Sequence, residues 1–196
     1  MSDQSAESKL YAIAESQAGY FSARQARQAG YSNALLSYHA RRGKFLRIQP
    51  GVYRLRHFPE QPHADLFAAW LSAGPQAVVS HKSALALYEL TDLLPSEIHL
   101  TVPRTASRRK RGIRLHTARL SPPEVTRRAG LPVTSLARTL ADLLRLGVEP
   151  YWVEQAIRQA LERGLVSAAE LRAYAQTHSR ALANILQTVL AESDSA

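Results

Sequence analysis

The stretch that decides the fold is SNALLSYHARRGKFLRIQPGVYRL, Ser32–Leu55. Ser32 is a suitable helix N-cap, and Leu35 and Leu36 are spaced for one buried helical face that ends before Gly43. Two short runs rich in β-branched and aromatic residues, KFLRI and GVYRL, then flank a QPG turn. The pattern therefore predicts a helix followed directly by a β-hairpin.

Two further helices are predicted before this stretch. The segment AESKLYAIAESQAG has apolar residues at helical spacing, and SARQARQAG follows with Ser22 as a plausible N-cap. Gly30 stands between the second and third helices, where a tight turn needs a residue that tolerates positive φ. Three helices and a hairpin in this order predict a winged helix-turn-helix.

The segment HFPEQPH, residues 57–63, has two prolines and no periodic apolar pattern, so we interpret it as a linker. We accordingly expect a winged helix-turn-helix domain over residues 1–57 and a mixed α/β domain over 64–196. The overall class predicted is α+β, with helices at the C-terminal end of the chain.

Within 64–196, the segments ADLFAAWLSAG and HKSALALYEL are expected to be helices, with the short strand AVVS between them and Ser80 capping the second helix. EIHLTV and GIRLHTA both alternate, and we expect them to pair as a long hairpin across the basic loop between them. Ser135 is expected to begin a helix in which Arg138 and Asp142 form an i,i+4 ion pair. Two more helices should follow, one of them opened by the capping box SAAE and broken near His178.

Positive charge is concentrated in two blocks of the chain. The net charge is +9, with nine Lys and Arg against four acids in residues 1–60 and nine against one in residues 101–130. Segregated basic charge of this kind is typical of proteins that bind nucleic acid.

The first block supplies groups suited to duplex DNA. In a winged helix-turn-helix the third helix enters the major groove and the wing follows the backbone. Asn can bond adenine, Arg can bond guanine or phosphate, and Ser and Tyr hydroxyls bond phosphate oxygens. The residues predicted to contact DNA are Ser32, Asn33, Ser37, Tyr38, Arg41, Arg42, Lys44, Arg47 and Arg54.

The first block also resembles a known family. AGYFSARQARQAGYSNALLSYHARRGKFLRIQPGVYRL is similar to the N-terminal domain of AbiEi-type antitoxins of type IV toxin–antitoxin systems. The similarity continues in AVVSHKSALALYELTDLLPSEIHLTVPR, GIRLHTARL and GLPVTSLARTLADLL, over roughly residues 10–165. RIQPGVYRL and SHKSALALYEL are its most specific pieces. Ser37-Tyr38-His39 departs from relatives that often carry more arginine there, so the operator sequence is expected to differ.

The resemblance implies a transcriptional autorepressor that binds promoter repeats on double-stranded DNA. It also implies an antitoxin that neutralises a nucleotidyltransferase-like toxin without forming a stable complex with it. Two alternatives stay open from the residues: a solitary transcriptional regulator without a toxin, and a nucleic-acid-processing enzyme. The only E-x-K triplet is Glu7-Ser8-Lys9, at the start of the chain, so we expect no enzyme activity.

The second basic block has a similar composition but no matching motif. A possible second phosphate-binding loop contains Arg104, Arg108, Arg109, Lys110 and Arg111. A solvated surface loop explains the same charge equally well. The exposed aromatic pair predicted at Tyr151 and Trp152 could serve a protein partner or self-association, and we expect a monomer or weak dimer.

Cofactors are not expected from the sequence. The chain has no cysteine, and its seven histidines form neither H-x-x-x-H nor HExxH, so no metal site is predicted. Ser80-His81 could suggest a nucleophile and base, but we expect adjacent side chains to point apart. The polar N-terminus lacks a secretory pattern and no long apolar run occurs, so a cytoplasmic protein with no membrane association is expected.

Overall fold

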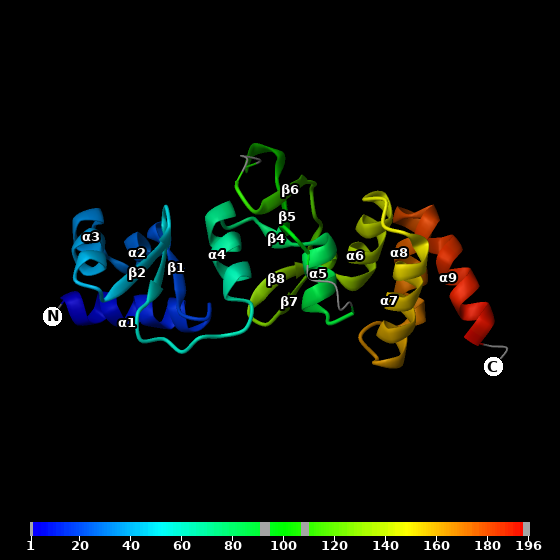
Figure 1. Ribbon diagram of the computed structural model, residues 1–196, viewed down its shortest axis with the longest axis horizontal. Coiled ribbons are helices and arrows are strands. Elements are labelled where there is room, and N and C mark those ends of the chain that lie inside the picture. The colour runs from blue at the N-terminus through cyan, green and yellow to red at the C-terminus, as the bar shows by residue number, and fades with distance from the viewer. Residues whose placement is uncertain (1, 91–94, 107–109, 194–196) are drawn as a thin grey trace. The chain divides into compact units, whose positions relative to one another are not determined.

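The chain forms two compact units, Met1–Ala77 and Val78–Ala196. They are seen in a computed structural model that describes residues 2–90, 95–106 and 110–193 (Figure 1). The predicted α+β class is confirmed, because helices and a small antiparallel sheet form the first unit, and a mixed sheet with C-terminal helices forms the second.

The first unit is a winged helix-turn-helix extended by one strand and one helix. Its sheet has the order β1-β3-β2 and is antiparallel throughout. The elements in chain order are α1 (Ser2–Glu15), β1 (Tyr20–Ser22), α2 (Ala23–Ala29), α3 (Asn33–Arg41), β2 (Phe45–Gln49), β3 (Val52–Leu55) and α4 (Ala64–Ala73).

The two faces of this sheet are covered by different helices. Phe21, Phe45 and Tyr53 lie on one face, in the apolar core that α1, α2 and α3 share with the sheet. Neighbouring strand residues point to opposite faces, and Tyr20 accordingly stacks on Phe67 of α4, with ring centroids 6.4 Å apart. Helix α4, which the sequence analysis places in the second domain, thus packs on the sheet of the first unit.

The second unit is built on a five-stranded mixed sheet with the order β6-β5-β4-β8-β7. Its strands are β4 (Val78–Val79), β5 (Ile98–Val102), β6 (Ile113–Thr117), β7 (Val125–Arg128) and β8 (Leu131–Thr134). Its α-helices are α5 (His81–Leu87), α6 (Leu136–Arg145), α7 (Pro150–Glu162), α8 (Ala168–His178) and α9 (Arg180–Ser193). Helices α5 and α6 pack together beside the sheet, and α7, α8 and α9 pack around α6 (Figure 1).

The predicted hairpin across the second basic block is wrong. Strands β5 and β6 are neighbours, but they run parallel, with Ile98 beside Ile113 and Val102 beside Thr117. A hairpin needs only a short turn, whereas parallel neighbours need a connection long enough to return the chain. Residues 103–112 provide that return, and the described part of it includes a short 3₁₀ helix, η1 (Arg104–Ala106).

A buried ionic network joins α6 to the loop before β7. Arg138 contacts Glu124 through Nη1 and Asp142 through Nε, each at 2.8 Å, which confirms the predicted i,i+4 pair and adds a partner. Tyr174 of α8 donates its hydroxyl to Glu124 at 2.9 Å. Burial alone would raise the pKa of Glu124, but hydrogen bonds from Ser121, Arg138 and Tyr174 lower it to about 2. The network therefore holds α6, α8 and this loop together through charged groups that are all partnered.

Candidate nucleic-acid interface

Helix α3 is positioned by the local signals that the sequence predicts. Gly30 ends α2 in the left-handed conformation with φ 108°. Ser32 then caps α3, and its hydroxyl accepts a hydrogen bond from the Leu35 backbone at 3.1 Å. Leu36 is buried and Leu35 is half-buried against the core. The opposite face of α3 is consequently turned to solvent.

Five polar residues lie along this exposed face and at its C-terminal end: Asn33, Ser37, Tyr38, Arg41 and Arg42. The guanidinium of Arg42 lies over the ring of Tyr38, 5.6 Å from its centroid. Among the described residues, neither Arg41 nor Arg42 has an ion pair or a hydrogen bond to its side chain. This end of α3 therefore presents two arginines whose donors are directed to solvent.

The wing adds a further unpaired arginine. Arg47 is exposed on β2 and has no carboxylate partner in the described part of the chain. The register shifts between Arg47 and Gln49, so that Ile48 lies at a bulge and is exposed. Bulges redirect side chains near sheet edges. The wing is fixed to the body of the unit, because Gln49 donates to the Ala68 carbonyl of α4 at 2.7 Å and the Ala23 backbone donates to Gly51 at 2.8 Å.

The structure differs from the sequence prediction at Arg54. This residue is buried, donates through Nη2 to the Phe58 carbonyl at 2.7 Å and lies over the ring of Tyr20. The physical reason is that β3 is the central strand of the sheet and α4 also packs on it. Arg54 therefore serves the fold, and we leave it out of the proposed interface.

Two other residues of the stretch have contacts within the unit. Lys44 forms an ion pair with Glu7 of α1 at 2.8 Å, with both side chains partly exposed. His39 is half-buried, and its ring packs between those of Tyr31 and Phe45, with centroids 5.8 and 5.5 Å away. Lys44 is thus a partly exposed cation that already has a carboxylate partner, and His39 is a packing residue.

The structure describes only part of the second basic loop. Arg108 and Arg109 lie outside the described residues. Arg104 is exposed in η1, Arg111 is exposed, and Lys110 is half-buried and forms an isolated bridge with Ile113. Its role as a phosphate-binding loop therefore stays a prediction.

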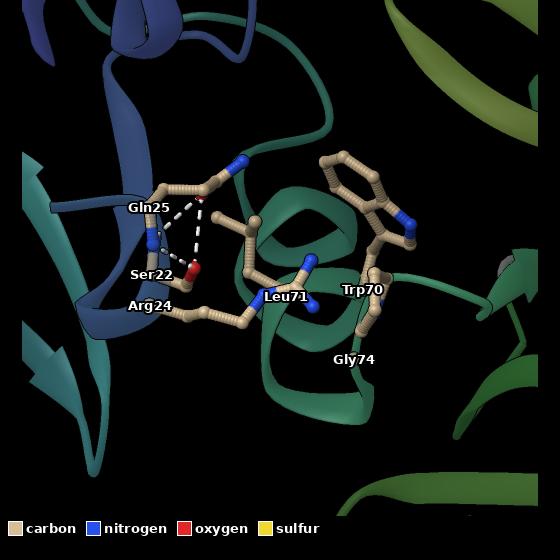
Figure 2. A pocket seen from close by; sticks show the side chains of 7 residues that line it. Ser22, Arg24, Gln25, Trp70, Leu71 and Gly74 are labelled. Carbon is tan, nitrogen blue, oxygen red and sulfur yellow. Dashed lines mark hydrogen bonds between the residues drawn. The ribbon is translucent and has the colours of Figure 1, made fainter. Parts of the chain in front are cut away.

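A shallow pocket of about 190 Å³ lies between the start of α2 and α4 (Figure 2). Its lining includes Ser22, Gln25, Trp70 and Leu71, and Arg24 stands exposed at its edge. Ser22 and Gln25 are already engaged with each other in a capping box. Apart from Arg24 at its edge, the lining is mainly apolar or already hydrogen-bonded, and we assign the pocket no function.

A cluster of three histidines in the second unit has no counterpart in the sequence prediction. His81 begins α5, His99 lies in β5 and His116 in β6, and one ring nitrogen from each lies within 4.8 Å of the others. Successive positions are 18 and 17 residues apart, so no local motif joins them. Only the pairing of β5 with β6 and the position of α5 bring them together, and among the described residues this is a group that could hold a metal.

The predictions made for Ser80 and His81 are also wrong. Ser80 precedes α5, but its side chain makes no capping hydrogen bond. Its hydroxyl instead lies 3.0 Å from Nδ1 of His81 and accepts from Thr101 at 2.8 Å. The two adjacent side chains meet because His81 has the left-handed conformation with φ 51°.

The comparisons with known proteins bear on the first unit. None of the curated proteins searched matches the chain. In the part of the chain that the structure describes, no helix is both long and apolar enough to cross a membrane. Residues 8–56, which run from α1 to just beyond β3, match the family described as the transcriptional regulator AbiEi antitoxin.

Proposed function

We propose that the first unit binds double-stranded DNA with α3 in the major groove and the wing along the backbone. The observation that carries this proposal is that Arg41, Arg42 and Arg47 are exposed and lack carboxylate partners among the described residues. A cation left unpaired by its own chain gains most from a polyanion, because phosphate contacts release condensed counterions. The match to a family of transcriptional regulators supports the same function.

The exposed side chains divide into two roles. Asn33 stands in the first turn of α3 and is suited to bond adenine, whereas Arg41 or Arg42 is suited to guanine. Ser37 and Tyr38 offer hydroxyls for phosphate oxygens, and Ser32 stands at the N-cap of the same helix. Arg47 on the wing and Lys44 before it would hold the backbone. We expect the first set to determine sequence preference and the second to determine overall affinity.

At the level of the whole protein, we propose an autorepressor that acts as the antitoxin of a type IV toxin–antitoxin system. The family match at residues 8–56 supports this role. The partner would be a nucleotidyltransferase-like toxin that is neutralised without a stable complex, and the DNA target would be promoter repeats upstream of the protein's own gene.

DNA binding is tested by fluorescence anisotropy with a duplex from that upstream region and a scrambled duplex. We expect the full chain to prefer the upstream duplex. Arg41→Ala or Arg42→Ala should cost about 1–3 kcal/mol if the residue contacts a base. Arg172→Ala is the matched control, because Arg172 is an exposed arginine on α8 of the other unit. Equal binding to both duplexes, or no effect of either α3 substitution, would contradict the proposal.

The antitoxin role has a separate test. The chain is expressed together with the product of an adjacent nucleotidyltransferase-like gene, and growth and co-purification are measured. We expect growth to be restored without stable co-purification. Growth arrest that persists at matched expression would contradict the antitoxin role and leave a solitary regulator.

A further inference from the structure

The three-histidine cluster is largely buried within the second unit. His81 and His99 are buried and His116 is half-buried at the edge strand β6. Nδ1 of His99 lies 3.0 Å from Nε2 of His116, and the rings of His81 and His116 stack with centroids 3.6 Å apart. Three imidazoles thus meet at one point between α5 and the sheet.

The surroundings of the three rings favour their neutral form over the protonated form. Burial, followed by the neighbouring imidazoles and nearby cations, lowers the pKa of His81 to about 3 and that of His99 to about 4. Burial also lowers the pKa of His116, although Asp142 opposes this. Neutral imidazole is the form that donates a lone pair to a metal.

The backbone conformation of His81 is an independent sign that the surrounding structure holds the three histidines in this arrangement. A left-handed conformation costs roughly 1–2 kcal/mol for a residue with a Cβ, and it persists where the surroundings fix it. Here it turns the imidazole toward Ser80 and His116. Hydrogen-bonded partners behind a histidine usually orient metal-binding imidazoles. Nδ1 of His81 lies beside the buried hydroxyl of Ser80, so metal binding at Nε2 requires the tautomer in which Nδ1–H donates to that hydroxyl.

We propose that His81, His99 and His116 form a binding site for a divalent transition-metal ion, with Zn²⁺ as the ion to test. Three histidine ligands and one open position, filled by water or another small ligand, are an established arrangement for zinc. Zn–N bonds of about 2.0–2.1 Å place tetrahedral ligand atoms roughly 3.3 Å apart. The ring nitrogens of His99 and His116 are already near that spacing. The ring nitrogen of His81 lies within 4.8 Å of them, and side-chain rotation can bring it to the same spacing.

The surrounding charges favour a specific occupant of the open position. Lys82 and Arg114 act electrostatically on the cluster, and Asp142 is engaged by Arg138 and Arg145. No carboxylate within the described residues joins the three histidines in the cluster. A bound dication would leave this region strongly positive, so we expect hydroxide or another small anion at the fourth position.

The test uses the full chain without a histidine tag, stripped with a chelator and titrated with Zn²⁺ by calorimetry. We expect one ion per chain. His81→Asn and His116→Asn should each weaken binding by about 100-fold or more, because losing even an outer partner costs about 10–100-fold. Asn is chosen at His81 because it tolerates left-handed backbone. His57→Asn, at an exposed histidine of the other unit, is the control and should bind like the native chain.

A second measurement does not depend on any variant folding. Imidazole ¹⁵N spectra of the native chain are recorded with and without Zn²⁺, and Co²⁺ is added separately for its visible absorption. We expect Zn²⁺ to shift the ¹⁵N signals of three histidines. We expect the Co²⁺ form to show the visible absorption of a four-coordinate ion. Absence of stoichiometric binding, shifts at other histidines, or full affinity in both cluster variants would overturn it.

Discussion

One set of arginines in the first unit and one arginine in the second have opposite surroundings. In the first unit, Arg41, Arg42 and Arg47 are exposed and have no acidic partner among the described residues. In the second unit, Arg138 is nearly enclosed and contacts two carboxylates at 2.8 Å each. The difference teaches that the number of basic residues in a block does not reveal their role. A paired and buried guanidinium stabilises its own fold, whereas an unpaired and exposed one is available to a polyanion.

The largest expected effect on stability comes from removing Arg138 from its buried ionic network. Arg138→Met leaves Glu124 without its cation and Asp142 with only Arg145, inside a buried network. Removing one member of such a network typically costs about 3–5 kcal/mol. Urea unfolding followed by circular dichroism measures this loss, and Arg172→Met should change stability by less than about 0.5 kcal/mol. A loss for Arg138→Met as small as that of the control would show that the network is not stabilising.

Acid should weaken the same network in a defined pH range. The pKa of Glu124 is lowered from 4.5 to about 2 in the folded protein, so its contribution is fully present above pH 4.5. The contribution is lost as the pH falls from 4.5 through about 2, and it amounts to at most about 3 kcal/mol. The difference in unfolding free energy between the native chain and Glu124→Gln should therefore narrow across this range. A difference that stays constant down to pH 2 would contradict the role of the Glu124 carboxylate.

A contrast within the first unit sharpens the comparison. Arg54 and Arg47 lie on adjacent strands, but only Arg54 is buried with a backbone acceptor. Arg54→Met should lower stability by about 1.5–3 kcal/mol, the usual value for a charged hydrogen bond. Arg47→Met should leave stability nearly unchanged and weaken DNA binding. Thermal unfolding and DNA-binding anisotropy of both variants test this. Loss of stability in Arg47→Met together with loss of DNA binding in Arg54→Met would mean that we have misidentified the arginine facing DNA.

The smallest expected effect is at Lys44. Its ion pair with Glu7 is partly exposed, and such pairs contribute only about 0–1 kcal/mol. Glu7→Gln should therefore barely change stability, while freeing Lys44 should tighten DNA binding slightly at low salt. Anisotropy at two salt concentrations measures the change. Weaker DNA binding by Glu7→Gln would indicate that Lys44 needs its acidic partner to be positioned.

Local signals in the sequence predict much of this fold. The caps Ser22, Ser32 and Ser167 and the turn glycine Gly30 act within a few residues of themselves, and the structure confirms each one. Strand β1 is missing from the prediction because its three residues are too few to show alternation. The site is only partly predictable, because the exposure of α3 follows from helical spacing, whereas the burial of Arg54 depends on α4 covering a central strand.

Long-range juxtapositions cannot be read from local patterns. The parallel pairing of β5 and β6 depends on how a ten-residue connection returns, and both hairpin and crossover are compatible with the alternation of the strands themselves. His81, His99 and His116 come together only through that pairing. Ser80 is a suitable cap by residue type, but the left-handed conformation of His81 brings the two side chains together instead.

The central claim is that the unpaired cations of α3 and the wing bind DNA, and that at least two of Arg41, Arg42 and Arg47 contact phosphates. Its most direct test is the salt dependence of DNA affinity for the native full chain and for a variant with Arg41→Ala, Arg42→Ala and Arg47→Ala. Each lost phosphate contact reduces the slope of log K against log salt by about one. We predict a slope shallower by about two to three, with unchanged stability; an unchanged slope would contradict the account.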